Sequence, residues 1–119
     1  MNNVDIAALE KRADHVAGRL SLLSNARRLL ILCQLADGEM SVGALQSSLG
    51  LSQSALSQHL SKLRTAGMVA TRREAQTIHY RIAEAEVQAL MAALYETFCK
   101  PATDDAAQAA DGAPDEVTD

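Results

Sequence analysis

Aromatic side chains are scarce in this chain. Its 119 residues include no Trp, one Phe and two Tyr, although 48% of all residues are hydrophobic. The core must therefore be built mainly from aliphatic side chains. A small aliphatic domain buries limited area within one chain, and association of two chains buries more. We therefore expect a dimer.

The chain also lacks long apolar runs and a signal peptide. No segment approaches the roughly 20 apolar residues that are needed to cross a bilayer. The N-terminal sequence MNNVDIAALEKR shows no signal-peptide pattern. These absences predict a cytoplasmic protein with no membrane partner, and the length predicts a single folded domain.

Metal ligands and catalytic groups are few. The two Cys and three His do not have metal-like spacing, and a metal site needs several convergent soft or imidazole ligands. An enzyme with a Cys nucleophile would need a base and an orienting group near the thiol, and nothing in the spacing indicates them. We expect no metal, no cofactor and no enzymatic activity.

Acidic residues are concentrated at the C-terminus, where basic residues are absent. Residues 101–119, PATDDAAQAADGAPDEVTD, hold six acids and no Lys or Arg. Without these six acids, the net charge of −4 becomes +2 for residues 1–100. The low content of large apolar residues predicts disorder. We therefore assign residues 1–100 to a folded domain and residues 101–119 to an acidic disordered tail.

Residues 51–82 differ from the rest of the chain in charge and in pattern. They contain five Lys and Arg residues and a single acid. The sequence LSQSALSQHLSKLRTAGMV predicts a helix, with Ser52 as its N-cap and Gly67 as its stop. Leu residues at positions 56, 60 and 63 have helical spacing and predict a buried face.

The opposite face of this predicted helix carries short, uncharged polar side chains. Ser54, Ser57, Gln58 and Ser61 recur with helical spacing, whereas an ordinary solvated face usually carries Glu and Lys. Short hydroxyls and amides suit a helix that lies close to base edges in the major groove of DNA. The alternative is that they are plain surface residues, and the charge and glycine stop of this region argue against it.

After Gly67 the hydrophobic pattern changes from helical spacing to alternation. Val69 and Thr71 alternate with polar residues, and so do Ile78, Tyr80 and Ile82. The alternation predicts two short strands joined around residues 73–76. A basic hairpin behind a reading helix is the layout of a wing.

Four further helices complete the expected order of helix, helix, helix, helix, strand, strand, helix. We expect them over residues 4–23, from Ser24 to Leu35, from Ser41 to Gly50 and over residues 84–99. A tight turn at Gly50 leads into the reading helix, and Pro101 stops the last helix. The fold class is therefore mainly α with a small β-hairpin. The apolar stripe of the last helix needs a partner, and the first helix and a second subunit are the candidates.

The polar helix, its end and the hairpin supply the candidate DNA-binding residues. They are Gln53, Ser54, Ser57, Gln58, His59, Lys62, Arg64, Arg72, Arg73 and Gln76. Ser54, Ser57 and Gln58 are expected to face bases, and the Lys and Arg side chains mainly phosphates. Arg27 and Arg28 are expected to pair with acids, with phosphate contact as the alternative, and His15 and His79 are expected to lie at the surface. An alternative is a winged helix that contacts proteins, with the acidic tail as a docking arm.

The segments LSLLSNARRLLILCQL, LSQSALSQHLSKLRTAGMV and RREAQTIHYRI closely resemble the ArsR/SmtB family of winged-helix repressors. They cover nearly all of residues 20–82. The resemblance implies a homodimer that has its first and last helices at the interface. It also implies binding to a double-stranded DNA operator, an imperfect palindrome, and release when an inducer acts.

The family divides by sensing site, and this chain departs from the metal-sensing patterns. Its segment SVGALQSSLG has no Cys or His, and AEAEVQALMAALYETFC has no His. Cys33 and Cys99, in the contexts LLILCQL and FCKP, resemble instead the branch that senses reactive sulfur species or oxidants. That resemblance implies neighbouring thiols that form a disulfide or polysulfide bridge, which lowers DNA affinity. The alternative is that both cysteines only pack and that the regulator responds to a metal or to no inducer.

Overall fold

The computed structural model describes residues 5–99, and the expected acidic tail lies outside them. The elements follow in the order α1 (Ile6–Leu23), α2 (Ala26–Ala36), β1 (Met40–Ser41), α3 (Val42–Leu49), α4 (Gln53–Thr65), β2 (Val69–Glu74), β3 (Thr77–Ile82) and α5 (Ala85–Phe98). The predicted order of helices and hairpin is confirmed, with β1 as an addition.

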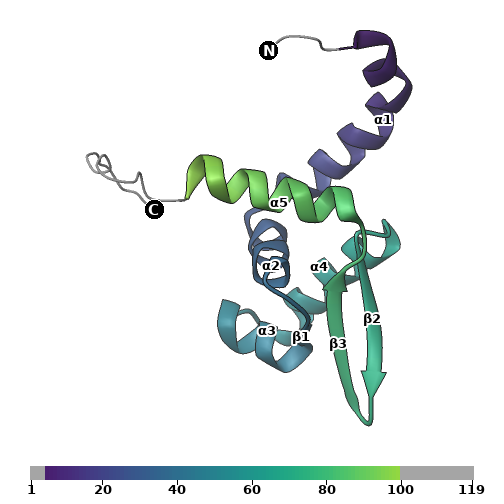
Figure 1. Ribbon diagram of the computed structural model, residues 1–119. Coiled ribbons are helices and arrows are strands. Elements are labelled where there is room, and N and C mark those ends of the chain that lie inside the picture. The colour runs from purple at the N-terminus through teal and green to yellow at the C-terminus, as the bar shows by residue number, and fades with distance from the viewer. Residues whose placement is uncertain (1–4, 100–119) are drawn as a thin grey trace, which may run out of the picture.

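The arrangement of the helices and the hairpin decides where the functional surfaces lie. Figure 1 shows α5 lying across α2, and α1 projecting away from the body beyond α5. The helices α3 and α4 lie on the other side of α2, and the hairpin of β2 and β3 extends away from α5. In this view α3 and the tip of the hairpin therefore lie at the opposite end of the molecule from α1.

The core is aliphatic, as the composition predicts. Within the described chain it contains no buried polar side chain. The expected inward face of α4 is confirmed, because Leu56, Leu60 and Leu63 are fully or almost fully buried. They pack in one cluster with side chains of α2, α3 and α5, among them Leu32 and Met91. This cluster fixes α4, so its opposite face must point to solvent.

Local capping explains where the helices begin and end. The hydroxyl of Ser52 accepts from the amide of Ala55 at 3.1 Å, and Gly67 follows α4 with a φ of 80°. Both predictions for α4 are therefore confirmed. The second helix starts later than expected, because Asn25 and not Ser24 is its N-cap. The side-chain oxygen of Asn25 accepts from the amides of residues 27 and 28.

A third strand enlarges the expected hairpin into a sheet with the order β1-β3-β2. Met40 pairs with Tyr80 and Ser41 with His79. The strand β1 is too short to show an alternating pattern, and therefore the sequence did not indicate it. The hairpin itself is tighter than expected: Glu74 pairs with Thr77, and Ala75 takes the left-handed conformation with a φ of 56°.

An ionic cluster joins α1 to the start of α5 and the end of α4. Nε of Arg19 donates to Oε1 of Glu84 at 3.1 Å, and its Nη2 donates to the carbonyl oxygen of Ala66 at 3.0 Å. His15 and Arg12 both contact Glu86, and the hydrogen bond from His15 is the main reason for the lowered pKa of Glu86. His15 and His79 were expected at the surface, and both are half-buried.

Large apolar side chains remain exposed on the outer helices. They are Ile6, Leu9 and Leu20 on α1, Leu30 on α2, and Tyr95 and Phe98 on α5. Phe98 is 77% exposed and Leu9 is 50% exposed. The stripe expected on α5 is thus only half covered within one chain, since Val87 and Met91 are buried.

Candidate DNA interface and dithiol site

The candidate reading residues form an exposed surface on α4 and the hairpin. All of those predicted from the sequence are exposed except His59, which is half-buried. Because the core fixes the opposite face of α4, Ser54, Ser57 and Gln58 are presented outward together. The side chains of Lys62, Arg64 and Arg73 form no ion pair with any carboxylate in residues 5–99. Three cationic groups are therefore available to phosphates.

Arg72 is held by carboxylates. Its Nε donates to Oε1 of Glu39 at 2.8 Å, and its Nη1 donates to Oε1 of Glu74 at 3.2 Å. This hydrogen bond from Arg72 is the largest cause of the lowered pKa of Glu39. Arg72 would have to leave these partners to contact a phosphate, so Arg73 is the better candidate at the hairpin. The sequence did not indicate Glu39 as a partner, because it lies outside the hairpin.

His59 lies on the inner border of the reading surface. Its Nδ1 is buried and has no hydrogen-bond partner among the described residues. Burial lowers the pKa of His59, and the positive charges of Arg28, Arg27 and Lys62 lower it further. The ring is therefore neutral at pH 7, because its pKa lies below the ordinary value of about 6.5.

The prediction that Arg27 and Arg28 pair with acids is wrong for the part of the chain that the structure describes. No carboxylate there forms an ion pair with either residue. Nε of Arg28 instead donates to the carbonyl oxygen of Leu22 at 2.9 Å. Both positive charges act on His59 of α4, so the start of α2 adds positive charge next to the reading helix.

The two cysteines are free and exposed. Cys33 lies on α2, and Cys99 directly follows α5. Although the residue is exposed, partial desolvation of its thiol is the main cause of a raised pKa of Cys33, and the negative charges of Cys99 and then Asp37 raise it further. The fold places Cys33 on the face of α2 that lines the pocket toward α5, and it places Cys99 at the end of α5.

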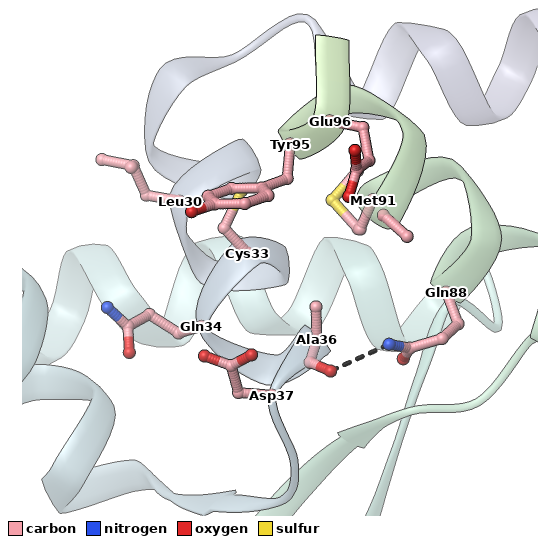
Figure 2. Close-up of a pocket in the computed structure, with 10 residues that line it drawn as sticks. Leu30, Cys33, Gln34, Ala36, Asp37, Gln88, Met91, Tyr95 and Glu96 are labelled. Atoms are coloured by element: carbon pink, nitrogen blue, oxygen red, sulfur yellow. Dashed lines mark hydrogen bonds between the residues drawn. The ribbon is translucent and has the colours of Figure 1, made fainter. Parts of the chain in front are cut away.

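A pocket of about 540 Å³ lies beside Cys33 between α2 and α5. Figure 2 shows Cys33 facing Met91, Tyr95 and Glu96 of α5. Nε2 of Gln88 donates to the carbonyl oxygen of Ala36 at 2.8 Å and fastens α5 to the last turn of α2. The sequence did not indicate this pocket, because its lining comes from two helices about 60 residues apart.

The described residues show neither a candidate metal site nor a candidate membrane-spanning helix. Residues 5–99 contain no group of three or more His, Cys, Asp or Glu side chains that could hold a metal ion. None of the helices described above is both long enough and apolar enough to span a membrane.

An outward polar helix after a tight turn, followed by a basic hairpin, defines a winged helix-turn-helix DNA-binding protein. The model of bacterial regulatory proteins of the arsR family matches residues 25–71. The biofilm growth-associated repressor of Agrobacterium fabrum is 48% identical over 85% of this chain and 86% of its own length. This chain belongs to the arsR family, and it is a transcriptional regulator and not an enzyme.

Two further relatives have solved structures. Reduced HlyU from Vibrio cholerae is 48% identical, with a TM-score of 0.75 over 78% of this chain and 98% of that chain; HlyU of that species is described as a transcriptional activator. The homodimeric winged helix-turn-helix DNA-binding domain Mb0332 from Mycobacterium bovis is 34% identical, with a TM-score of 0.63 over 82% of this chain and 89% of that chain.

Proposed function

We propose that this protein is a cytoplasmic repressor that binds an operator as a homodimer and loses affinity when Cys33 and Cys99 become bridged. The observation that carries the switch is the position of two free, exposed thiols: Cys33 faces the pocket between α2 and α5, and Cys99 directly follows α5. In the cytoplasm such thiols are normally reduced, and disulfides there are usually transient or sensory. Persulfides or oxidants are the proposed inducers.

An imperfect palindrome is the proposed DNA partner, because a homodimer presents two copies of the reading surface related by twofold symmetry. Ser54, Ser57 and Gln58 are outward on a helix that can enter the major groove, and such side chains can bond base edges. Lys62, Arg64 and Arg73 are free of carboxylate partners in the described chain and are proposed to contact phosphates. Repression is proposed because the relative from Agrobacterium is a repressor.

Replacement of Gln58 and Arg73 separates base reading from phosphate contact. Gln58→Ala should weaken binding to the preferred site by about 1–3 kcal/mol and binding to random DNA much less, because it removes a base contact. Arg73→Ala should weaken both alike and should reduce the salt dependence, because it removes a phosphate contact. Fluorescence anisotropy with both DNAs over a range of salt concentrations measures these effects. If Gln58→Ala weakened binding to both DNAs equally, the assignment of Gln58 to a base contact in the major groove would be wrong.

The bridge can form from a persulfide or from an oxidant. A cysteine thiolate attacks the outer sulfur of a small persulfide, which leaves a protein persulfide and releases the small thiol. The second cysteine then attacks the inner sulfur, which forms the disulfide and releases hydrogen sulfide. With hydrogen peroxide the first cysteine becomes a sulfenic acid and releases water, and the second displaces another water. Both routes end in the same disulfide. If both cysteines first become persulfides, the outer sulfur of one attacks the inner sulfur of the other, which forms a trisulfide and releases hydrogen sulfide.

The raised pKa of Cys33 predicts a steep pH dependence of its reactivity. A thiol reacts as the thiolate, so the rate should rise about tenfold per pH unit while the pH is below the pKa. The rise should continue beyond pH 8.5, where an ordinary cysteine is about half ionised. Alkylation of Cys33 in Cys99→Ser protein measures this profile, because burial, the main cause of the shift, remains in that variant. A plateau below pH 8 would contradict a raised pKa of Cys33.

Mass spectrometry combined with DNA binding tests the proposal. Protein is treated separately with hydrogen peroxide and with a small persulfide, digested without reduction, and assayed in parallel on operator DNA. We expect a peptide that links Cys33 to Cys99 in both samples, with weaker DNA binding that a reducing agent restores. If the link forms fully and the affinity does not change, the cysteines are not the switch.

A further inference from the structure

The first helix is buried only toward its C-terminal end. All side chains of α1 from Ile6 to Asp14 are exposed, and the first half-buried ones are His15 and Val16. In Figure 1 the N-terminal part of α1 projects away from the body. The direction of this helix therefore depends on the contacts that its C-terminal half makes.

The segment that leaves α4 and the segment that enters α5 form one corner of the molecule. The amide of Ala83 donates to the carbonyl oxygen of Met68 at 2.9 Å, so residues 66–68 are joined to residues 83–84. Glu84 is the N-cap of α5, but its side chain makes no capping hydrogen bond. Its carboxylate is therefore free to accept hydrogen bonds from outside α5.

Arg19 of α1 binds both segments of this corner. Its Nε and Nη2 donate to the two carboxylate oxygens of Glu84, and Nη2 also donates to the carbonyl oxygen of Ala66 at 3.0 Å. Ala66 is the C-cap of α4, so one side chain joins the first helix to the end of the reading helix. The side chains of Arg19 and Glu84 are only 19% and 24% exposed. A bidentate pair of this kind fixes the plane of the guanidinium as well as its distance.

We propose that Arg19 is a positioning residue that sets the direction of α1 relative to the reading helix, and thereby the separation of the two reading helices in the dimer. This inference rests on the proposed homodimer, with α1 at its interface. The stretch from Ile6 to Arg19 is roughly 20 Å long, at about 1.5 Å per residue. A rotation of about 10° at Arg19 would move Ile6 by roughly 3.5 Å, which is about the rise of one base pair. A small change at this contact is therefore enough to alter the preferred spacing of the half-sites.

Palindromes that differ in the spacing of their half-sites test this role. A palindrome is selected from random DNA with the reduced, full-length parent protein, and one base pair is then inserted or deleted at its centre. Each change moves one half-site by about 3.4 Å and rotates it by roughly 35° about the DNA axis. Fluorescence anisotropy measures the affinity for the three palindromes and for a single half-site, and sedimentation measures the assembly of each protein.

The parent protein should bind the selected palindrome about tenfold or more tightly than the altered ones, because avidity is lost when the two half-sites cannot be engaged together. Arg19→Gln should remain dimeric and should lower this ratio by roughly threefold or more, mainly through weaker binding to the selected palindrome. Its affinity for a single half-site should not change, because the Arg19 guanidinium is engaged at the corner. Glu84→Gln weakens the same contact from the side of α5 and should act in the same way. If Arg19→Gln does not fold in a thermal melt, Glu84→Gln decides.

Arg12→Gln is the matched control. Arg12 also lies on α1, but it binds Glu86 at 3.1 Å and not the corner, so its replacement removes the same charge from the same helix and should leave the ratio unchanged. An unchanged ratio in Arg19→Gln, an equal loss in Arg12→Gln, or a monomeric Arg19→Gln protein would overturn the inference. A monomeric parent protein that does not distinguish the three palindromes would reject the homodimer and the inference together. A dimeric parent whose spacing preference survives in both Arg19→Gln and Glu84→Gln would reject the role of Arg19 alone.

Discussion

Cys33→Ser and Cys99→Ser are each expected to bind operator DNA as tightly as the reduced parent protein and to lose the response to persulfides and oxidants. Cys33 belongs to α2, which leads into the helix-turn-helix, and Cys99 follows α5, which lies across α2 (Figure 1). A bond between the two thiols would hold the helix-turn-helix and α5 in one relative arrangement. Either replacement removes one end of that bond.

The size of the response follows from the coupling free energy. A bridge that favours the weakly binding arrangement by about 1–3 kcal/mol lowers the affinity about 5- to 150-fold. By the same coupling, bound DNA should disfavour the bridge at equilibrium. Anisotropy titrations of the parent and both variants, before and after treatment with persulfide and after reduction, measure the response.

Two controls make this result specific. The double variant has no thiol left, because the chain contains two cysteines, and it should show the same constant affinity in every condition. The bridge is expected within one chain, so a denaturing gel without reducing agent should show no covalent dimer of the treated parent protein. If one single variant responded like the parent, the dithiol switch would be excluded.

The reading helix could be predicted from the sequence because its determinants are local. Ser52 caps it, Gly67 ends it, and three Leu residues define its buried face, and the structure confirms each of them. The polar side chains must then point outward, because they lie on the side of the helix opposite to the buried Leu residues. Capping and helical periodicity act within a few residues, so a single sequence contains this information.

Features that depend on distant partners could not be predicted in this way. Arg72 meets Glu39 across 33 positions of the chain, and Gln88 meets Ala36 across 52. The pocket beside Cys33 arises only when α5 packs on α2. That the two thiols lie close enough to bridge stays an expectation, which comes from the family resemblance and not from their spacing.

Dimer formation gives the other large expected effect. Leu9 is 50% exposed on α1, the helix that projects from the body in Figure 1. It shares an exposed apolar face with Ile6, and α5 adds Tyr95 and Phe98. We propose that these faces of α1 and α5 meet those of a second subunit, as the homodimeric relative from Mycobacterium bovis suggests. A charge placed there would be buried without a partner in the dimer, and such burial is costly.

Leu9→Glu should therefore convert a micromolar dimer into a monomer, which sedimentation of the reduced protein measures. Affinity for a palindrome with half-sites about 34–36 Å apart should fall about 10²- to 10⁴-fold, because one reading helix no longer holds the other near its half-site. Affinity for a single half-site should change little. Ala7→Glu, at an exposed position on the other face of α1, adds the same charge and should remain dimeric. A reduced parent protein that is monomeric and still binds the palindrome with full affinity would contradict the proposed assembly.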